Sequence, residues 1–166
     1  FSMKYPSVHF EIYEGLMTNV VTQLINGSAE LGIANIQMVD IDKFDILLTQ
    51  EEHLYAIFRR DVFWTDREHD TITWEDIKKC PLSLSGGSVR MIMQSSLTDM
   101  EQLNAVAITT TKSSAIEWAS SGRTVSLVPM DAKELVNHRK MARIKLPEFS
   151  GDFKKAFITL KGHALS

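Results

Sequence analysis

The residues best suited to chemistry are short polar groups that open helices or follow strands. The segment Ser85-Gly-Gly-Ser88 directly precedes a Met-rich stretch, Val89 to Leu97, that we expect to be a helix. Unpaired N–H groups and partial positive charge at a helix start favour a carboxylate or phosphate, and glycines let a ligand approach the backbone. The same segment is also typical of an ordinary turn with a serine cap. The sequence therefore indicates either an anion-binding turn or a helix cap.

Other polar residues stand where predicted elements meet. Met17 and Thr18 open an earlier predicted helix, and Asn35 follows Ala34 at the end of a short predicted strand. In open α/β sheets, ligands bind beside the carboxyl ends of strands. Asn35 can donate and accept hydrogen bonds, although it also suits a turn. Thr111 follows another strand, where it could line a binding site or cap the next helix.

Catalytic, metal and cofactor chemistry find little support. The five histidines lie far apart in the sequence, without the i, i+3 or i, i+4 pairing of metal ligands. No spacing suggests a Ser–His–Asp triad or a nucleophile elbow. The single cysteine, Cys80, cannot form an internal disulfide and is interpreted as a structural residue. Arg90 and Lys112 could neutralise an anionic ligand, although single basic residues are usually only solvated. We expect no catalytic residue, no metal and no cofactor.

The composition is that of an ordinary globular protein. The chain has 166 residues, of which 44% are hydrophobic and 23% charged, and its net charge is −3. This length can form one good core or two small ones. The negative charge disfavours nucleic-acid binding by this chain alone, and no apolar run reaches membrane-spanning length.

Two strand–helix–strand units, separated by a middle segment, would position these residues. Because apolar side chains alternate in Val8–Ile12, we expect a strand there, then a helix stopped by Gly27 and a second strand at Ala29–Ala34. The later unit is a strand at Ala105–Thr111, a helix opened by a Ser114–Glu117 capping box, and a strand at 125–129. The other predicted elements are a helix capped by Thr73–Asp76, a helix at 131–138, and strands at 46–48, 53–58, 82–84, 144–146 and 156–160.

Four segments carry a family resemblance over essentially the whole chain, in matching order and spacing: Tyr5–Gly15, Leu24–Ile33, Trp74–Ile77 before Pro81, and Ala119–Pro129. They resemble the effector-binding domain of LysR-type transcriptional regulators. Glu30 stands where the family usually has Asp, and Thr124 where it usually has Gly. By this resemblance, the domain's first strand and helix and the winged helix-turn-helix are missing, so we expect an N-terminally truncated domain.

The resemblance implies an α/β fold like that of type 2 periplasmic binding proteins, with two lobes and a ligand cleft between them. Lobe one would hold residues 1–50 and 130–166, and lobe two residues 51–129, with the chain crossing near Glu51–Leu54 and near Pro129. The family binds its effectors at the segment that corresponds here to Ser85–Ser88. Together with the helix starts and strand ends described above, this gives as expected effector-binding residues Met17, Thr18, Ala34, Asn35, Ser85, Gly87, Ser88, Thr111 and Pro129.

The implied function is that of a ligand-sensing regulatory domain in a bacterial transcription factor that binds a small, carboxylate-type metabolite. DNA would be bound only through the missing winged helix-turn-helix. We expect a cytoplasmic homodimer or homotetramer, paired partly through helix Thr18–Asn26, with no membrane partner. The alternatives are a solute-binding protein of a transport system with the same fold, and an enzyme on that fold. An upstream helix-turn-helix or an upstream signal peptide would decide between regulator and transporter.

Overall fold

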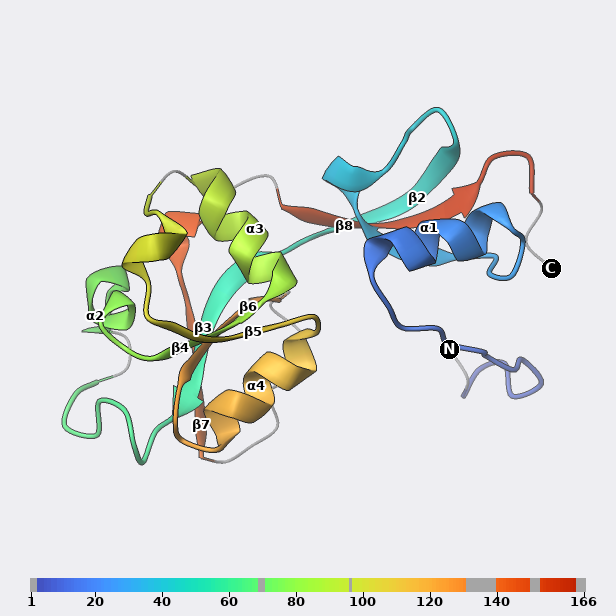
Figure 1. The fold of residues 1–166 in the computed structure, drawn as a ribbon. Coiled ribbons are helices and arrows are strands. Elements are labelled where there is room, and N and C mark those ends of the chain that lie inside the picture. The colour runs from blue at the N-terminus through green and yellow to red at the C-terminus, as the bar shows by residue number, and fades with distance from the viewer. Residues whose placement is uncertain (1–2, 69–70, 96, 131–139, 150–152, 164–166) are drawn as a thin grey trace. The chain divides into compact units, whose positions relative to one another are not determined.

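The computed structural model describes residues 3–68, 71–95, 97–130, 140–149 and 153–163. The chain divides into two units, a smaller one of Phe1–Thr49 with Ala156–Ser166 and a larger one of Gln50–Lys155 (Figure 1). The polypeptide passes from one unit to the other inside strands β2 (Phe44–Glu51) and β8 (Lys154–Leu160). Each unit has its own sheet and its own core.

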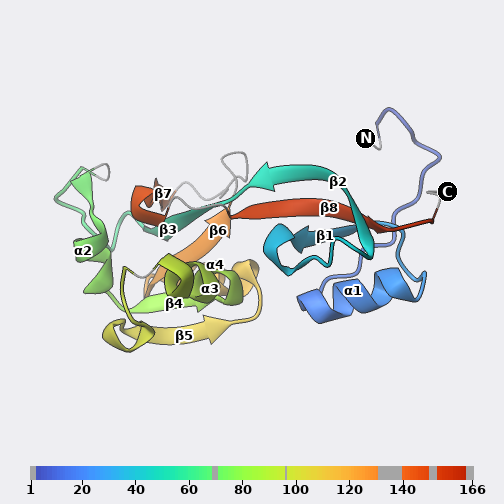
Figure 2. The same cartoon turned by 90° about the horizontal axis from the view of Figure 1, so that it is seen from above.

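The smaller unit is a three-stranded sheet with one helix on it. The sheet has the order β1-β8-β2, where β1 is Gly32–Asn35, and helix α1 (Met17–Ile25) lies along it (Figure 2). Leu24 of α1 is buried against Ala34, Phe44 and Ile158 from the three strands. The helix ends as the sequence predicts, because Gly27 takes a left-handed backbone conformation with φ +68° and donates its N–H to the Leu24 carbonyl.

The strand predicted at Val8–Ile12 is wrong. Residues 8–12 are not in a strand and belong to neither sheet of the described chain. Phe10 and Ile12 are 59% and 81% exposed. An alternating pattern becomes a strand only where a neighbouring strand supplies a hydrogen-bonding ladder, and no described strand lies alongside this segment. The second predicted strand of this unit forms as β1, shortened to begin at Gly32.

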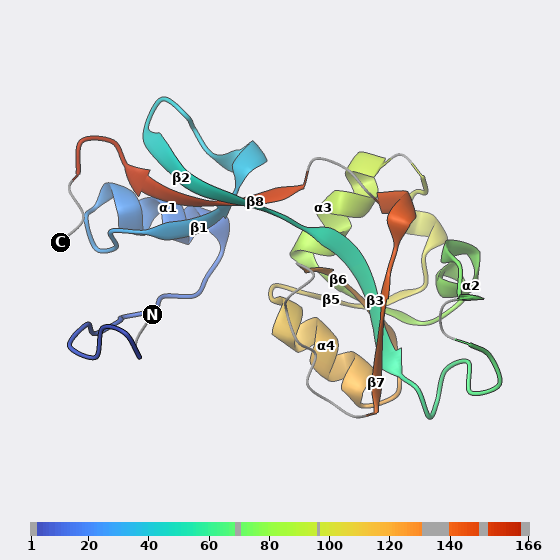
Figure 3. The same cartoon turned by 180° about the vertical axis from the view of Figure 1, so that it is seen from behind.

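The larger unit is a five-stranded mixed sheet covered on both faces (Figure 3). Its order is β5-β4-β6-β3-β7, with β4 parallel to β5 and β6, and β3 antiparallel to β6 and β7. The strands are β3 (His53–Arg59), β4 (Leu82–Ser85), β5 (Ala105–Thr109), β6 (Val125–Met130) and β7 (Met141–Lys145). The helices are α2 (Trp74–Lys78), α3 (Gly86–Ser95) and α4 (Lys112–Ser120). The larger unit also has the 3-10 helices η3 (Met100–Gln102) and η4 (Pro147–Phe149), and the smaller unit has η1 (Ile36–Met38).

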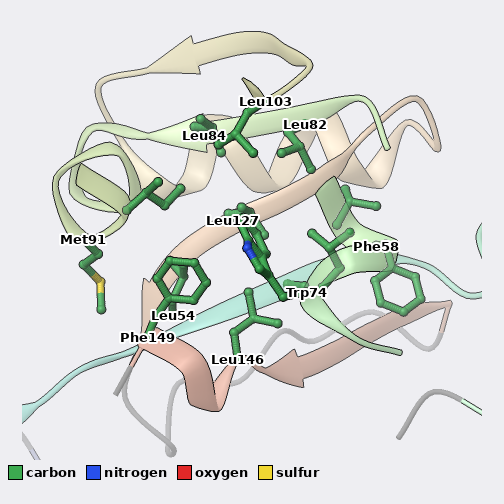
Figure 4. Packing of buried hydrophobic residues seen from close by; sticks show 14 of the residues in the cluster. Leu54, Phe58, Trp74, Leu82, Leu84, Met91, Leu103, Leu127, Leu146 and Phe149 are labelled. Carbon is green, nitrogen blue, oxygen red and sulfur yellow. The ribbon is translucent and has the colours of Figure 1, made fainter. Parts of the chain in front are cut away.

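Side chains of the sheet's central strands alternate between two cores. Leu54 and Phe58 of β3 face a cluster that includes Leu127 and the side chains of α2 and α3 (Figure 4). In that cluster the Trp74 and Phe149 rings meet edge to face, with centroids 4.8 Å apart. Tyr55 and Ile57 face the opposite side, under α4. Burial on both faces explains why these strands read as continuous apolar runs in the sequence.

Local signals predict two of the helix starts with different success. The capping box of α2 is confirmed, since Thr73 Oγ1 accepts from the Asp76 N–H and Asp76 Oδ2 accepts from the Thr73 N–H. The predicted capping box at Ser114 is wrong. Helix α4 begins three residues earlier, at its N-cap Thr111, whose hydroxyl accepts from the Ser114 N–H. Consecutive Thr and Ser residues there offer several equivalent caps, so sequence alone leaves the register open.

The predicted lobe boundary at residue 130 also differs from the structure. Strand β7 belongs to the larger unit because it pairs antiparallel with β3, with Ala56 opposite Ile144. Pro129 lies inside β6, opposite Leu54, so it is not a crossing point between the units. The second crossing lies instead between Lys155 and Ala156 in β8. The helix predicted at 131–138 lies outside the described residues.

Candidate functional site

One edge of the larger sheet collects the ends of parallel strands and the starts of helices. Strand β4 ends at Ser85 and α3 begins at Gly86; β5 ends at Thr109 and α4 begins at Lys112. Ser85 lies opposite Thr109 in the β4–β5 register, so both connections are neighbours. We call residues 85–88, 109–112 and 129–130 the carboxyl edge. In open α/β sheets this is where ligands bind.

The two serines at the start of α3 form a closed hydrogen-bonding unit. The Ser85 N–H donates to Ser88 Oγ at 3.0 Å, the Ser88 N–H donates to Ser85 Oγ at 3.2 Å, and the hydroxyl oxygens lie 2.7 Å apart. Ser88 Oγ also donates to the Leu127 carbonyl of β6. Both side chains are buried. The predicted helix cap therefore forms here, and both hydroxyls are engaged within the fold.

The two glycines of this turn have different structural reasons. A Cβ added to Gly87 would lie 2.7 Å from Cγ of Pro129, so Gly87 is required for packing of α3 against β6. A Cβ added to Gly86 would meet only the Thr109 carbonyl oxygen, at 4.0 Å. Gly86, which is not among the predicted effector-binding residues, is exposed and is thus the position of this turn that is open to a ligand. The first turn of a helix leaves its N–H groups without intrahelical acceptors, so backbone donors are available beside it.

The start of α4 supplies the second part of the carboxyl edge. Thr111 caps the helix through the Ser114 N–H, and its hydroxyl also lies 3.0 Å from Ser114 Oγ. The Thr109 hydroxyl is within hydrogen-bond distance of the Leu84 and Thr111 carbonyl oxygens. No acidic residue lies in the first turn of α3 or α4. The helix dipoles and Lys112 therefore give this edge a positive character.

A charged cluster lies beside α4. The Glu52 carboxylate, 8% exposed, has Lys155 Nζ at 2.8 Å and Lys112 Nζ at 3.9 Å from the same oxygen. Neither Glu52 nor Lys155 was singled out from the sequence. They come from the two ends of the larger unit, and no local spacing connects them. The sequence signal that could have found Glu52 is its position directly before an apolar strand. An acidic residue at such a position is easily buried, and a buried carboxylate requires a cation nearby.

The remaining predicted site residues lie in the smaller unit. Ala34 is buried in the core under α1. Asn35 Oδ1 accepts from the Gln37 N–H at 3.0 Å and caps the 3-10 helix that follows β1. Thr18 is exposed, and Met17 is partly buried against the core. No side chain caps the start of α1, where Leu16 occupies the N-cap position. The backbone of Met17 and Thr18 therefore offers donors that the fold's side chains leave unused.

The predicted site residues thus fall into two groups. Ser85, Gly87, Ser88, Thr111 and Pro129 come together at the carboxyl edge of the larger unit. Met17, Thr18, Ala34 and Asn35 belong to the smaller unit. At most of these positions, the observed role of the side chain is to cap a helix or to pack in a core, so a bound ligand would be met chiefly by backbone groups.

Other chemical possibilities are restricted by the same structure. The Cys80 thiol is half-buried and lies 3.6 Å from the Asp76 carbonyl oxygen. Burial, and secondarily the Asp76 charge, raise the pKa of this thiol, which opposes a nucleophilic role. Within the described ranges, no group of three His, Cys, Asp or Glu residues could hold a metal ion. The same ranges contain no helix long and apolar enough to cross a membrane.

Solved structures similar to this chain include LysR-type regulators and their ligand-binding domains. HinK, a LysR family transcriptional regulator from Pseudomonas aeruginosa, matches with TM-score 0.67 and 16% identity over 99% of this chain and 58% of its own. The effector binding domain of QuiR in complex with shikimate matches with TM-score 0.71 and 15% identity, over 95% and 74%. The cofactor-binding domain of the Cbl transcriptional regulator matches with TM-score 0.68 and 18% identity, over 99% and 73%.

These matches confirm the predicted α/β fold of the type 2 periplasmic-binding-protein kind. The chain spans little more than half the length of the first regulators that it matches, between 55% and 59% of their chains. No curated protein sequence gave a significant match. The family model described as the LysR substrate binding domain matches residues 1–166. The chain therefore belongs to the LysR substrate binding domain family, the effector-binding domains of LysR-type transcriptional regulators.

Proposed function

We propose that this domain senses a small anionic metabolite for a DNA-binding transcription regulator and catalyses no reaction. The observation that carries the proposal is the carboxyl edge, where α3 and α4 start after the neighbouring strands β4 and β5, beside the open position at Gly86. Two helix N-termini and a lysine, with no acidic residue in either first turn, favour a carboxylate. A solute-binding or enzymatic role has no comparable support, since the family consists of regulator domains.

The ligand class follows from the donors available. Backbone N–H groups at Gly86 and Gly87 would bind carboxylate oxygens, and the cluster of Lys112, Lys155 and Glu52 would add one net positive charge beside them. QuiR's effector binding domain was solved with shikimate, a carboxylate, which is consistent with this class. From the smaller unit, the uncapped start of α1 at Met17 and Thr18 and the end of β1 at Ala34 and Asn35 would contribute further contacts to the effector.

The partners follow from the family. DNA would be bound by a separate winged helix-turn-helix domain of the same protein, acting in the cytoplasm, and the regulator would form homodimers or homotetramers. Helix α1 is the proposed part of that pairing surface, and Ile25 at its end is 49% exposed. An effector would act by binding one conformation of the domain better than another, because only differential affinity shifts a conformational equilibrium.

A thermal-shift screen of small carboxylates, shikimate among them, tests the proposal on the full-length protein. A ligand at 100 times its dissociation constant should add about 2.7 kcal/mol of stability. Gly86→Leu should abolish that gain, because a side chain at this open position covers the helix start without entering the core. Met93→Leu is the matched control, since Met93 is 66% exposed on the same helix. A stabilising carboxylate whose effect survives Gly86→Leu would exclude the carboxyl edge as its site.

A further inference from the structure

Strands β2 and β8 carry the two connections between the units and are neighbours in the smaller sheet, and Glu52 links their ends within the larger unit. Glu52 lies between β2 and β3, just inside the larger unit. Its N–H donates to the Phe153 carbonyl oxygen at 2.8 Å, and its carboxylate lies 2.8 Å from Lys155 Nζ. Lys155 is the last residue of the larger unit before the chain returns. In addition to the β2–β8 pairing, Glu52 therefore joins the outgoing and returning chains by a backbone bond and an ion pair.

The same carboxylate also reaches a helix. Lys112 Nζ, at the first residue of α4, lies 3.9 Å from the Glu52 oxygen that faces Lys155. The Glu52 side chain is 8% exposed, whereas those of Lys155 and Lys112 are 27% and 30% exposed. A nearly buried carboxylate needs its cations, because separation would leave an uncompensated charge away from water. The two lysines are thus held toward one point from different parts of the unit.

We propose that Glu52 is a clasp that fastens the two chain connections to each other and to the first turn of α4. The clasp confines flexibility of the connections to residues before Glu52 and after Lys155. It also gives the first turn of α4 a direct physical link to those connections. That turn belongs to the proposed ligand-binding edge, so a bound ligand would also affect the connections through the clasp. This consequence rests on the proposed function, whereas the existence of the clasp is independent of it.

Hydrogen–deuterium exchange on the full-length protein, without ligand, tests the clasp. Glu52→Gln keeps the side-chain shape and removes the charge. We expect roughly tenfold or faster exchange in three separate segments, namely residues 51–54, 153–156 and the first turn of α4, while β4 and α2 keep their rates. The chain offers a matched control, because Glu51 and Lys154 repeat the same residue types one position earlier. Among the described residues, neither is joined to a partner by an ion pair.

A double-mutant cycle separates the clasp from general loosening. Glu52→Gln and Lys155→Met should be strongly non-additive in the exchange of residues 153–156, whereas Glu51→Gln and Lys154→Met should be additive. Lys112→Met should speed exchange in the first turn of α4 and leave residues 153–156 unchanged. If Glu52→Gln does not fold, the two lysine variants still test the clasp. Lys155→Met should speed exchange in residues 153–156, and Lys112→Met should speed exchange only in the first turn of α4. Additive effects of Glu52→Gln and Lys155→Met, or equal effects in the control pair, would overturn the proposal whatever ligand is found.

Discussion

The adjacent glycines at the start of α3 should respond in opposite directions to the same substitution. In Gly87→Ala the new Cβ would lie 2.7 Å from Cγ and 3.5 Å from Cδ of Pro129. Pro129 has little room to move, since it lies in β6 opposite Leu54 in the middle of the sheet. In Gly86→Ala the nearest atom to the new Cβ is 4.0 Å away. The two variants therefore differ only in whether the added methyl group meets the core.

The magnitudes follow from these contacts. Overpacking of this kind costs about 1–3 kcal/mol, and replacing a helical glycine by alanine returns about 0.5–1 kcal/mol. Gly87→Ala should therefore destabilise the larger unit by about 1–2 kcal/mol. Gly86→Ala has no packing cost and should be neutral or stabilising by up to about 1 kcal/mol. The separation between the two, about 2 kcal/mol, is well above the error of a comparison between matched variants.

Urea unfolding followed by tryptophan fluorescence measures this difference in the correct unit. All three tryptophans, Trp64, Trp74 and Trp118, lie in the larger unit, so their emission reports its unfolding. Equal m-values for the variants would show that the same transition is being compared. If Gly87→Ala proved as stable as Gly86→Ala, the contact with Pro129 would not be the reason for glycine at position 87, and close approach of a ligand would become the better explanation.

Three further outcomes are expected. Ser88→Ala should cost about 2–4 kcal/mol of stability, because the buried Ser85 N–H loses its acceptor and the Leu127 carbonyl loses one donor. Urea unfolding measures this loss, and a clearly smaller value would contradict the prediction. The Arg67 guanidinium is the main group that lowers the pKa of the Asp76 carboxyl in the folded state, and hydrogen bonds from Thr73 are the second cause. The ionised carboxyl therefore stabilises the fold at pH values above its unfolded pKa of about 4. This contribution disappears as the pH falls through the lower folded pKa. Wild type should therefore lose more stability than Asp76→Asn on acidification below about pH 4, and parallel acid melts would refute this. Cys80→Ser should leave effector-induced stabilisation unchanged, because the half-buried thiol lies within the larger unit away from the carboxyl edge, and a lost response at unchanged stability would argue for a sensing role.

The sequence by itself determined the features that depend on neighbouring residues. The capping box of Thr73 and Asp76 and the helix stop at Gly27 need only a few consecutive residues and one left-handed glycine. The order and spacing of short motifs along the chain also predicted the family, and through the family the fold. Motif order carries this information because it follows the order in which strands and helices occur along the chain. The same information placed a helix start beside Ser85, although it left open whether the serines cap the helix or contact a ligand.

Tertiary structure decided everything that requires residues distant in sequence to meet. Val8–Ile12 has a strand pattern without a strand, because alternation records a preference and only a neighbouring ladder satisfies it. The pairing of β7 with β3 moved a whole segment into the larger unit. Gly87 is explained by Pro129, and Glu52 by lysines from α4 and β8. Such contacts leave no periodic trace in a single sequence, since close packing and charge pairing are properties of positions in space.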